Sequence, residues 1–124
     1  MTTVRTRPSR ELLLKNRITK IDNKTINNVI EAVSKEFEID IKKMAHKARY
    51  RDLVLARNMC YYILHTTFLQ KASQIAPFFK RDRTTILHGL NTFVNDIEVI
   101  PFYMEKYDSV MDSIELPENI YALK

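Results

Sequence analysis

A short polar stretch, Asp82-Arg83-Thr84-Thr85, with His88 one turn further on, holds the side chains best suited to binding chemistry. The Asp82 carboxylate can cap a helix by accepting amide hydrogens two or three residues further on. Arginine at such a helix start can donate two hydrogen bonds to guanine, while threonine offers a hydroxyl to phosphate or a methyl to thymine. This chemistry suits contact with DNA. The same residues also serve as plain caps and solvated side chains in many proteins.

The stretch should open a helix that runs from Arg83 to about Val99 and stops before Pro101. Apolar residues recur there at helical spacing and should face inward, namely Ile86, Leu90, Phe93, Val94 and Ile97. A brief helix, Lys71 to Phe79, and a tight turn precede it. A short helix, a tight turn and a longer helix with a polar start make a helix-turn-helix pattern, here without the usual turn glycine.

The rest of the chain also reads as amphipathic helices. We expect them over residues 25–38, just after the capping residue Asp40, over residues 52–69 and over residues 103–114. Their inward-facing residues should include Ile41, Met44, Leu53, Ala56, Cys60, Ile63, Leu64, Met104, Tyr107, Val110 and Met111. With one glycine and four prolines in 124 residues, the fold should be all-α.

We expect the chain to have three parts. Residues 1–24 form a basic N-terminal arm, and residues 25–98 form the helix-turn-helix domain. Residues 99–124 carry an acidic helix and a tail, and this helix should dock on the core or form a homodimer. Residues 42–83 hold ten lysines and arginines against two acids, which favours a polyanionic partner, although a solvated face could carry the same charge.

No pattern for catalysis is present in the sequence. Three scattered histidines and one cysteine give no zinc spacing, and no paired carboxylates, nucleophile elbow or glycine loop occurs. A single cysteine, Cys60, and the absence of a signal peptide or a long apolar run predict a cytoplasmic protein without disulfide or membrane contact. We expect no enzymatic activity and no cofactor, neither nucleotide nor metal.

Three segments resemble the C-terminal DNA-binding domain of the bacterial replication initiator DnaA. The segment from Arg81 to His88 resembles that family's signature, R-D-H-T-T-V-L-H, with Arg83 in place of histidine and Ile86 in place of valine. The segment from Arg49 to Met59 is similar to the family's basic loop and the helix after it, and Val29 to Met44 is similar to the domain's opening. The resemblance covers roughly residues 25–98.

The resemblance implies a helical fold related to the Trp repressor, which binds double-stranded DNA. Its helix-turn-helix would lie in the major groove, and Arg49 would reach the adjacent minor groove. The full set of expected contacts is Arg49, Arg51, Arg57, Lys71, Ser73, Lys80, Arg81, Asp82, Arg83, Thr84, Thr85 and His88. Ser73 stands where a proline is typical of the family, and the turn before Arg81 is one residue shorter than usual, so the resemblance does not carry over the exact DNA site. Arg83 in place of histidine predicts a preferred site that differs from the family's at one or two adjacent positions.

From the resemblance we expect a free-standing module that binds DNA sequence-specifically. It should act at the nucleoid, in replication initiation or its regulation. The chain cannot hold the initiator's ATPase domain, because a phosphate-binding loop needs more than the single Gly89. Two alternatives stay open. The module could act as a transcriptional regulator, or it could keep the fold and instead bind replication proteins through its acidic helix.

Overall fold

The computed structural model describes residues 23–45 and 50–114, and every regular element among them is helical. Predictions for the arm before residue 23, for Arg49 and for the tail after residue 114 lie outside the described residues. Asn23 and Lys24, assigned to the arm by the sequence pattern, open the first described helix instead.

The predicted helices are present, with ends shifted by a few residues at most. In chain order they are α2 (Asn23–Phe37), the 3₁₀ helix η2 (Ile41–Ala45), α3 (Arg51–Thr66), α4 (Ala72–Phe79), α5 (Arg83–Val99) and α6 (Pro101–Ser113). The bounds of α5 match the prediction because Asp82 caps its start and Pro101 follows its end. Asp40 caps η2, as expected, by accepting a 3.0 Å hydrogen bond from the Lys42 amide.

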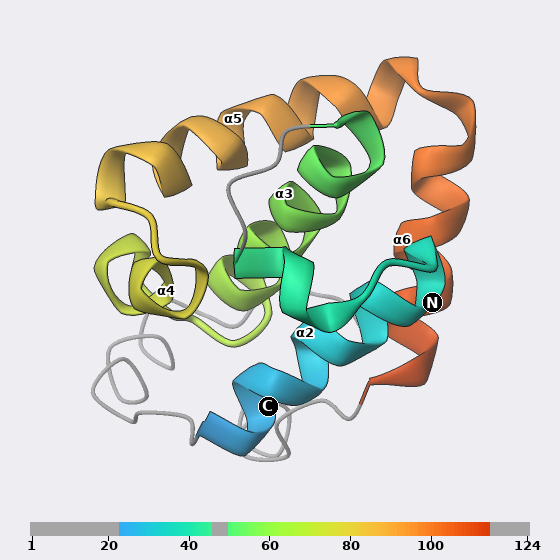
Figure 1. Ribbon diagram of the computed structural model, residues 1–124. Coiled ribbons are helices and arrows are strands. Elements are labelled where there is room, and N and C mark those ends of the chain that lie inside the picture. Colours follow the sequence, from blue (N-terminus) through green and yellow to red (C-terminus); the bar gives the residue numbers. More distant parts are fainter. Residues whose placement is uncertain (1–22, 46–49, 115–124) are drawn as a thin grey trace, which may run out of the picture.

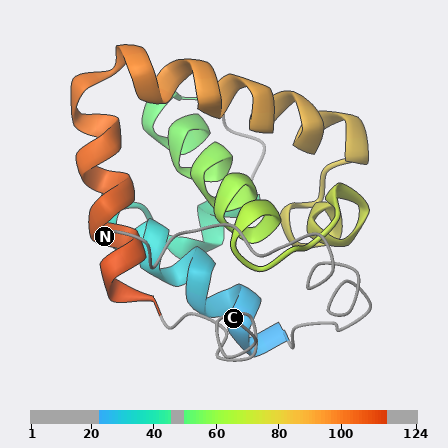
Figure 2. The same ribbon diagram turned by 180° about the vertical axis from the view of Figure 1, so that it is seen from behind.

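Helix α3 is the centre of the fold. Helix α5 crosses α3 on one side, α2 packs on the other side, and α6 closes one end by lying against both α2 and α5 (Figures 1 and 2). Buried apolar side chains of α3 supply much of the core, including Leu53, Ala56, Met59, Cys60, Ile63 and Leu64. This continuous burial explains why the sequence of α3 shows apolar residues on nearly every side.

An aromatic cluster joins the helices at the centre of the core. Phe93 of α5 stacks on Tyr62 of α3 with ring centroids 4.3 Å apart, and it also lies 5.2 Å from the Tyr103 ring of α6. The Tyr103 hydroxyl donates a 2.6 Å hydrogen bond to the carbonyl oxygen of Leu55. Helix α6 is thereby joined to the core of the same chain, which is one of the two positions that its amphipathic pattern predicted.

Three inward-facing predictions are wrong. Val94 is 50% exposed, Met104 47% and Ile41 42%. Each lies beside a residue that is buried or packed on the core, and successive residues of an α-helix are about 100° apart around its axis. Val94 therefore falls at the edge of the stripe centred on Phe93, and Tyr103 takes the buried position expected for Met104.

Candidate nucleic-acid interface

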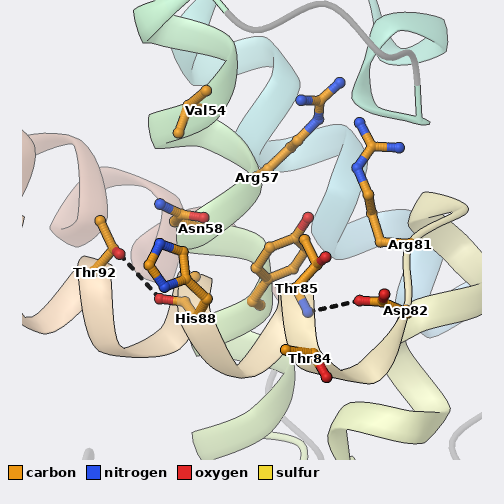
Figure 3. Close-up of a pocket in the computed structure, with 11 residues that line it drawn as sticks. Val54, Arg57, Asn58, Arg81, Asp82, Thr84, Thr85, His88 and Thr92 are labelled. Atoms are coloured by element: carbon orange, nitrogen blue, oxygen red, sulfur yellow. Dashed lines mark hydrogen bonds between the residues drawn. The ribbon is translucent and has the colours of Figure 1, made fainter.

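The predicted cap at the start of α5 is confirmed. Asp82 has an extended backbone, and its Oδ1 atom accepts a 2.8 Å hydrogen bond from the Thr85 amide (Figure 3). Hydrogen bonds from Thr85 hold the pKa of the Asp82 carboxyl below its usual range. The carboxylate is thus charged at neutral pH and fixes the first turn of α5.

The residues after the cap face solvent. Arg83, Thr84, Thr85 and His88 are all exposed, whereas Ile86 and Gly89 are buried between them. Two faces of one helix are therefore separated within its first two turns, one packed on the core and one free to contact a partner. The exposed face holds the cationic and hydroxyl side chains that the sequence analysis selected.

The turn between α4 and α5 forms without a glycine. Lys80 adopts the left-handed conformation with φ of 54°, which glycine normally supplies at a helix end. Its amide bonds back to the carbonyls of α4, and the Arg81 amide donates a 3.2 Å hydrogen bond to Ala76. Nη1 of Arg81 donates to the carbonyls of Phe79 and Lys80, so part of this guanidinium closes the turn.

A hollow of about 500 Å³ lies between the start of α5 and the middle of α3 (Figure 3). Thr84, Thr85, His88 and Thr92 line it from α5, and Val54, Asn58 and Tyr61 line it from α3. Burial raises the pKa of the Tyr61 hydroxyl to about 12, although the nearby Arg57 and Arg81 act in the opposite direction. The hollow is therefore lined by hydroxyl, amide and imidazole groups, with the guanidinium groups of Arg57 and Arg81 and the carboxylate of Asp82 beside them.

Arg57 lies differently from the other expected contacts. Arg57 is only 5% exposed. Its guanidinium donates hydrogen bonds to the carbonyl oxygens of Met44, at 2.9 Å, and Lys43, at 3.3 Å. A buried cation with backbone partners is poorly placed to meet a phosphate. The sequence held the signal for this position, because Arg57 lies four residues after the buried Leu53 and three before the buried Cys60.

Of the other expected contacts outside α5, four are exposed and one lies outside the described residues. Arg51, Lys71, Ser73 and Lys80 are exposed, at the starts of α3 and α4 and in the turn. Lys71 precedes α4, and its amide donates a 2.8 Å hydrogen bond to the Gln74 side chain. Arg49 lies outside the described residues, so its minor-groove role stays a prediction.

Gly89 positions this surface, and the sequence analysis did not foresee that role. A Cβ atom placed on Gly89 would lie 2.6 Å from Oδ1 of Asn58 and 2.7 Å from the Tyr61 ring, so α5 approaches α3 closely only because residue 89 is glycine. An isolated glycine inside a helical pattern is the available sequence signal for such a contact.

The described residues include no group of three or more histidine, cysteine or acidic side chains placed to hold a metal ion. Within the same ranges, no helix combines the length and the apolar character needed to cross a membrane.

Comparison with known families identifies the fold of this surface. A model of the bacterial dnaA protein helix-turn-helix matches residues 26–92, which include α2 from Ile26 onward, η2, α3, α4 and the first turns of α5. The chain belongs to this family. The family model describes a helix-turn-helix and not a catalytic domain, and its match includes the Asp82 cap and the exposed residues that follow it.

Curated relatives of this helix-turn-helix are named chromosomal replication initiator protein DnaA. The Porphyromonas gingivalis protein is 30% identical over 79% of this chain, and the Bacteroides fragilis protein is 32% identical over 60%. The Mycoplasma pneumoniae protein is 29% identical over 69% of the chain. The matched stretches span between 16% and 20% of the lengths of these relatives.

Proposed function

We propose that this chain binds double-stranded DNA sequence-specifically, with the start of α5 in the major groove. The observation that carries the proposal is the capped first turn of α5, which presents Arg83, Thr84, Thr85 and His88 to solvent within a DnaA helix-turn-helix. A fixed helix start with exposed cationic and hydroxyl groups is how such motifs meet base edges.

The residues around α5 would mainly position the duplex. Lys71 and Ser73 at the start of α4, Lys80 in the turn and Arg51 on α3 are exposed and suited to phosphate contacts. Arg81 would combine such a contact with its bonds to the turn carbonyls. Arg57 is left out of the proposed contact surface because it is buried. Binding would need neither nucleotide nor metal.

The names of the relatives support a role in replication initiation or its regulation, in the cytoplasm at the nucleoid.

The competing role, binding of replication proteins, is favoured by one feature of α6. This helix buries Tyr103, Val110 and Met111 in the core and exposes the acidic residues Glu105, Asp108 and Asp112. Such a surface suits a basic partner protein better than DNA.

Selection of bound duplexes from a random pool tests sequence-specific binding, and Arg83→His gives the internal comparison. Arg83 is exposed and longer than histidine, and it can pair bidentately with guanine O6 and N7. We expect the wild type to select a defined site with a guanine preference that the variant loses. A bidentate pair discriminates by about 1–3 kcal/mol, which such a selection resolves. Recovery of random sequences by the wild type would contradict the proposal.

A further inference from the structure

The short helix η2 carries two adjacent lysines, Lys42 and Lys43. The family resemblance assigns no role to them, and they lie outside the helix-turn-helix formed by α4 and α5. Lys42 and Lys43 are exposed, while the next residue, Met44, is only 2% exposed and anchors η2 in the core. Helix η2 packs against α2, α3 and α4, so it lies beside the first helix of the helix-turn-helix (Figure 1). Two cations are therefore held next to the proposed DNA-binding face.

The backbone that carries these lysines is fixed from both directions. Arg57 of α3 donates hydrogen bonds to the carbonyl oxygens of Lys43 and Met44. Asp40 accepts a hydrogen bond from the Lys42 amide, which engages one carboxylate oxygen of the nearest acidic residue in the sequence. An ordered backbone reduces the conformational entropy lost when a lysine side chain is immobilised on a partner.

Both lysine residues are exposed, so a partner can reach their charges. Nζ of Lys43 lies 6.0 Å from the centre of the Tyr50 ring, which is itself 47% exposed. Within the part of the chain that the structure describes, neither ammonium group forms an ion pair with a carboxylate. Figure 3 shows the side chains of Arg57 and Arg81 extending toward the same side, where Arg57 meets η2. Positive charge thus continues from the turn before α5 toward η2.

We propose that Lys42 and Lys43 bind backbone phosphates of duplex DNA outside the segment that α5 contacts. The proposal rests on the proposed function and extends the DNA footprint to the side of α4 and η2. Lysine suits this task as a flexible point charge that needs no defined acceptor geometry. Contacts of this kind add affinity and salt dependence without sequence preference.

Charge-removing variants test the proposal. Lys42→Gln/Lys43→Gln is compared with Lys35→Gln, which removes an exposed lysine in the last turn of α2. Fluorescence anisotropy of a labelled duplex is followed over a salt series. Each lost phosphate contact should lower the salt slope by about 0.9 and weaken binding about fivefold near physiological salt. The double variant should show up to twice that slope change, and Lys35→Gln should match the wild type.

Two further measurements separate a phosphate contact from a structural effect. Lys43→Arg keeps the charge and should keep wild-type affinity, and circular dichroism should show unchanged helix content in every variant.

On a duplex trimmed to the site that α5 contacts, the difference between wild type and double variant should shrink, because the flanking phosphates are gone.

The result that would overturn the proposal is a double variant with wild-type affinity and salt slope on the long duplex. If instead the wild type bound no duplex at all, the proposed function would fail together with this extension. A deficit of the double variant that persisted unchanged on the trimmed duplex would place the contact within the segment bound by α5, and it would refute the extended footprint.

Discussion

Nε of Arg57 on α3 donates a 2.9 Å hydrogen bond to the carbonyl oxygen of Met44, and this bond ties α3 to η2. A second bond from the same guanidinium reaches Lys43. Buried backbone carbonyls at the end of a short 3₁₀ helix need such donors. Arg57 thereby fixes η2, which precedes Arg49 in the chain, the residue expected to enter a minor groove.

The first prediction is that Arg57→Gln destabilises the fold. Hydrogen bonds that involve a charged group contribute about 1.5–3 kcal/mol each, so we expect the free energy of unfolding in urea to fall by at least about 2 kcal/mol. Arg51→Gln is the matched control, because Arg51 is exposed on the first turn of the same helix and should change stability by less than about 0.5 kcal/mol. Equal stabilities of the two variants would contradict the structural role of Arg57.

Much of the fold was predictable because local signals agree with packing. The helix that begins after Asp82 was placed correctly from a capping residue at one end and a proline at the other. The burial of Arg57 was missed although its helical phase indicated it, because its charge suggested a surface contact and its hydrogen-bond acceptors lie 13 and 14 residues earlier in the chain. Residues at the edges of helical stripes, such as Val94, depend on which neighbouring helix covers them, and periodicity alone does not specify that.

The exposed candidate residues were found because helical phase separates them from Ile86 and Gly89. Helical phase does not specify which bases or phosphates these residues contact, so the individual contacts stay a proposal. The predicted boundary of the helix-turn-helix domain at residue 98 also stays a proposal. Tyr103 and Val110 of α6, which follow that boundary, are buried in the core that α3 and α5 form.

Gly89→Ala should destabilise the packing of α5 on α3. Alanine favours a helix over glycine by about 1 kcal/mol, but its Cβ would meet Asn58 and the Tyr61 ring at 2.6–2.9 Å. Overpacking of this kind costs about 1–3 kcal/mol, so we expect a net loss of up to about 2 kcal/mol in chemical denaturation. Asn91→Ala, at an exposed position of the same helix, should be neutral or slightly stabilising. A Gly89→Ala variant more stable than the wild type would show that α3 can move aside.

Lys80→Gly should separate stability from DNA binding. Lys80 has a φ of 54°, and a non-glycine residue in this region costs about 1 kcal/mol, so glycine should raise stability by a similar amount. The same change removes a cation that we propose to contact phosphate. Glu38→Gly is the control, because Glu38 has a φ of 56° at the end of α2. It should raise stability and leave DNA affinity unchanged, and a parallel loss of affinity in both glycine variants would contradict the assignment.

The cap of α5 should make part of the stability depend on pH. Because the pKa of Asp82 is lowered in the folded state, its contribution is present above the usual aspartate range and is lost as pH falls through the lowered value. Asp82→Asn keeps a capping side chain without a titrating charge. We therefore expect its difference in melting temperature from the wild type to change between neutral pH and about pH 3, below the usual aspartate pKa. A constant difference over that range would exclude a charged cap.

The measurement that tests the central claim most directly is the affinity of the chain for a labelled duplex at salt concentrations from about 50 to 200 mM. Exposed cations around the capped start of α5 should bind phosphates, so affinity should fall steeply and log-linearly with salt over that range. We predict measurable binding at the low end without added nucleotide or metal. Absence of binding there, or binding indifferent to salt, would contradict the assignment of this surface to DNA.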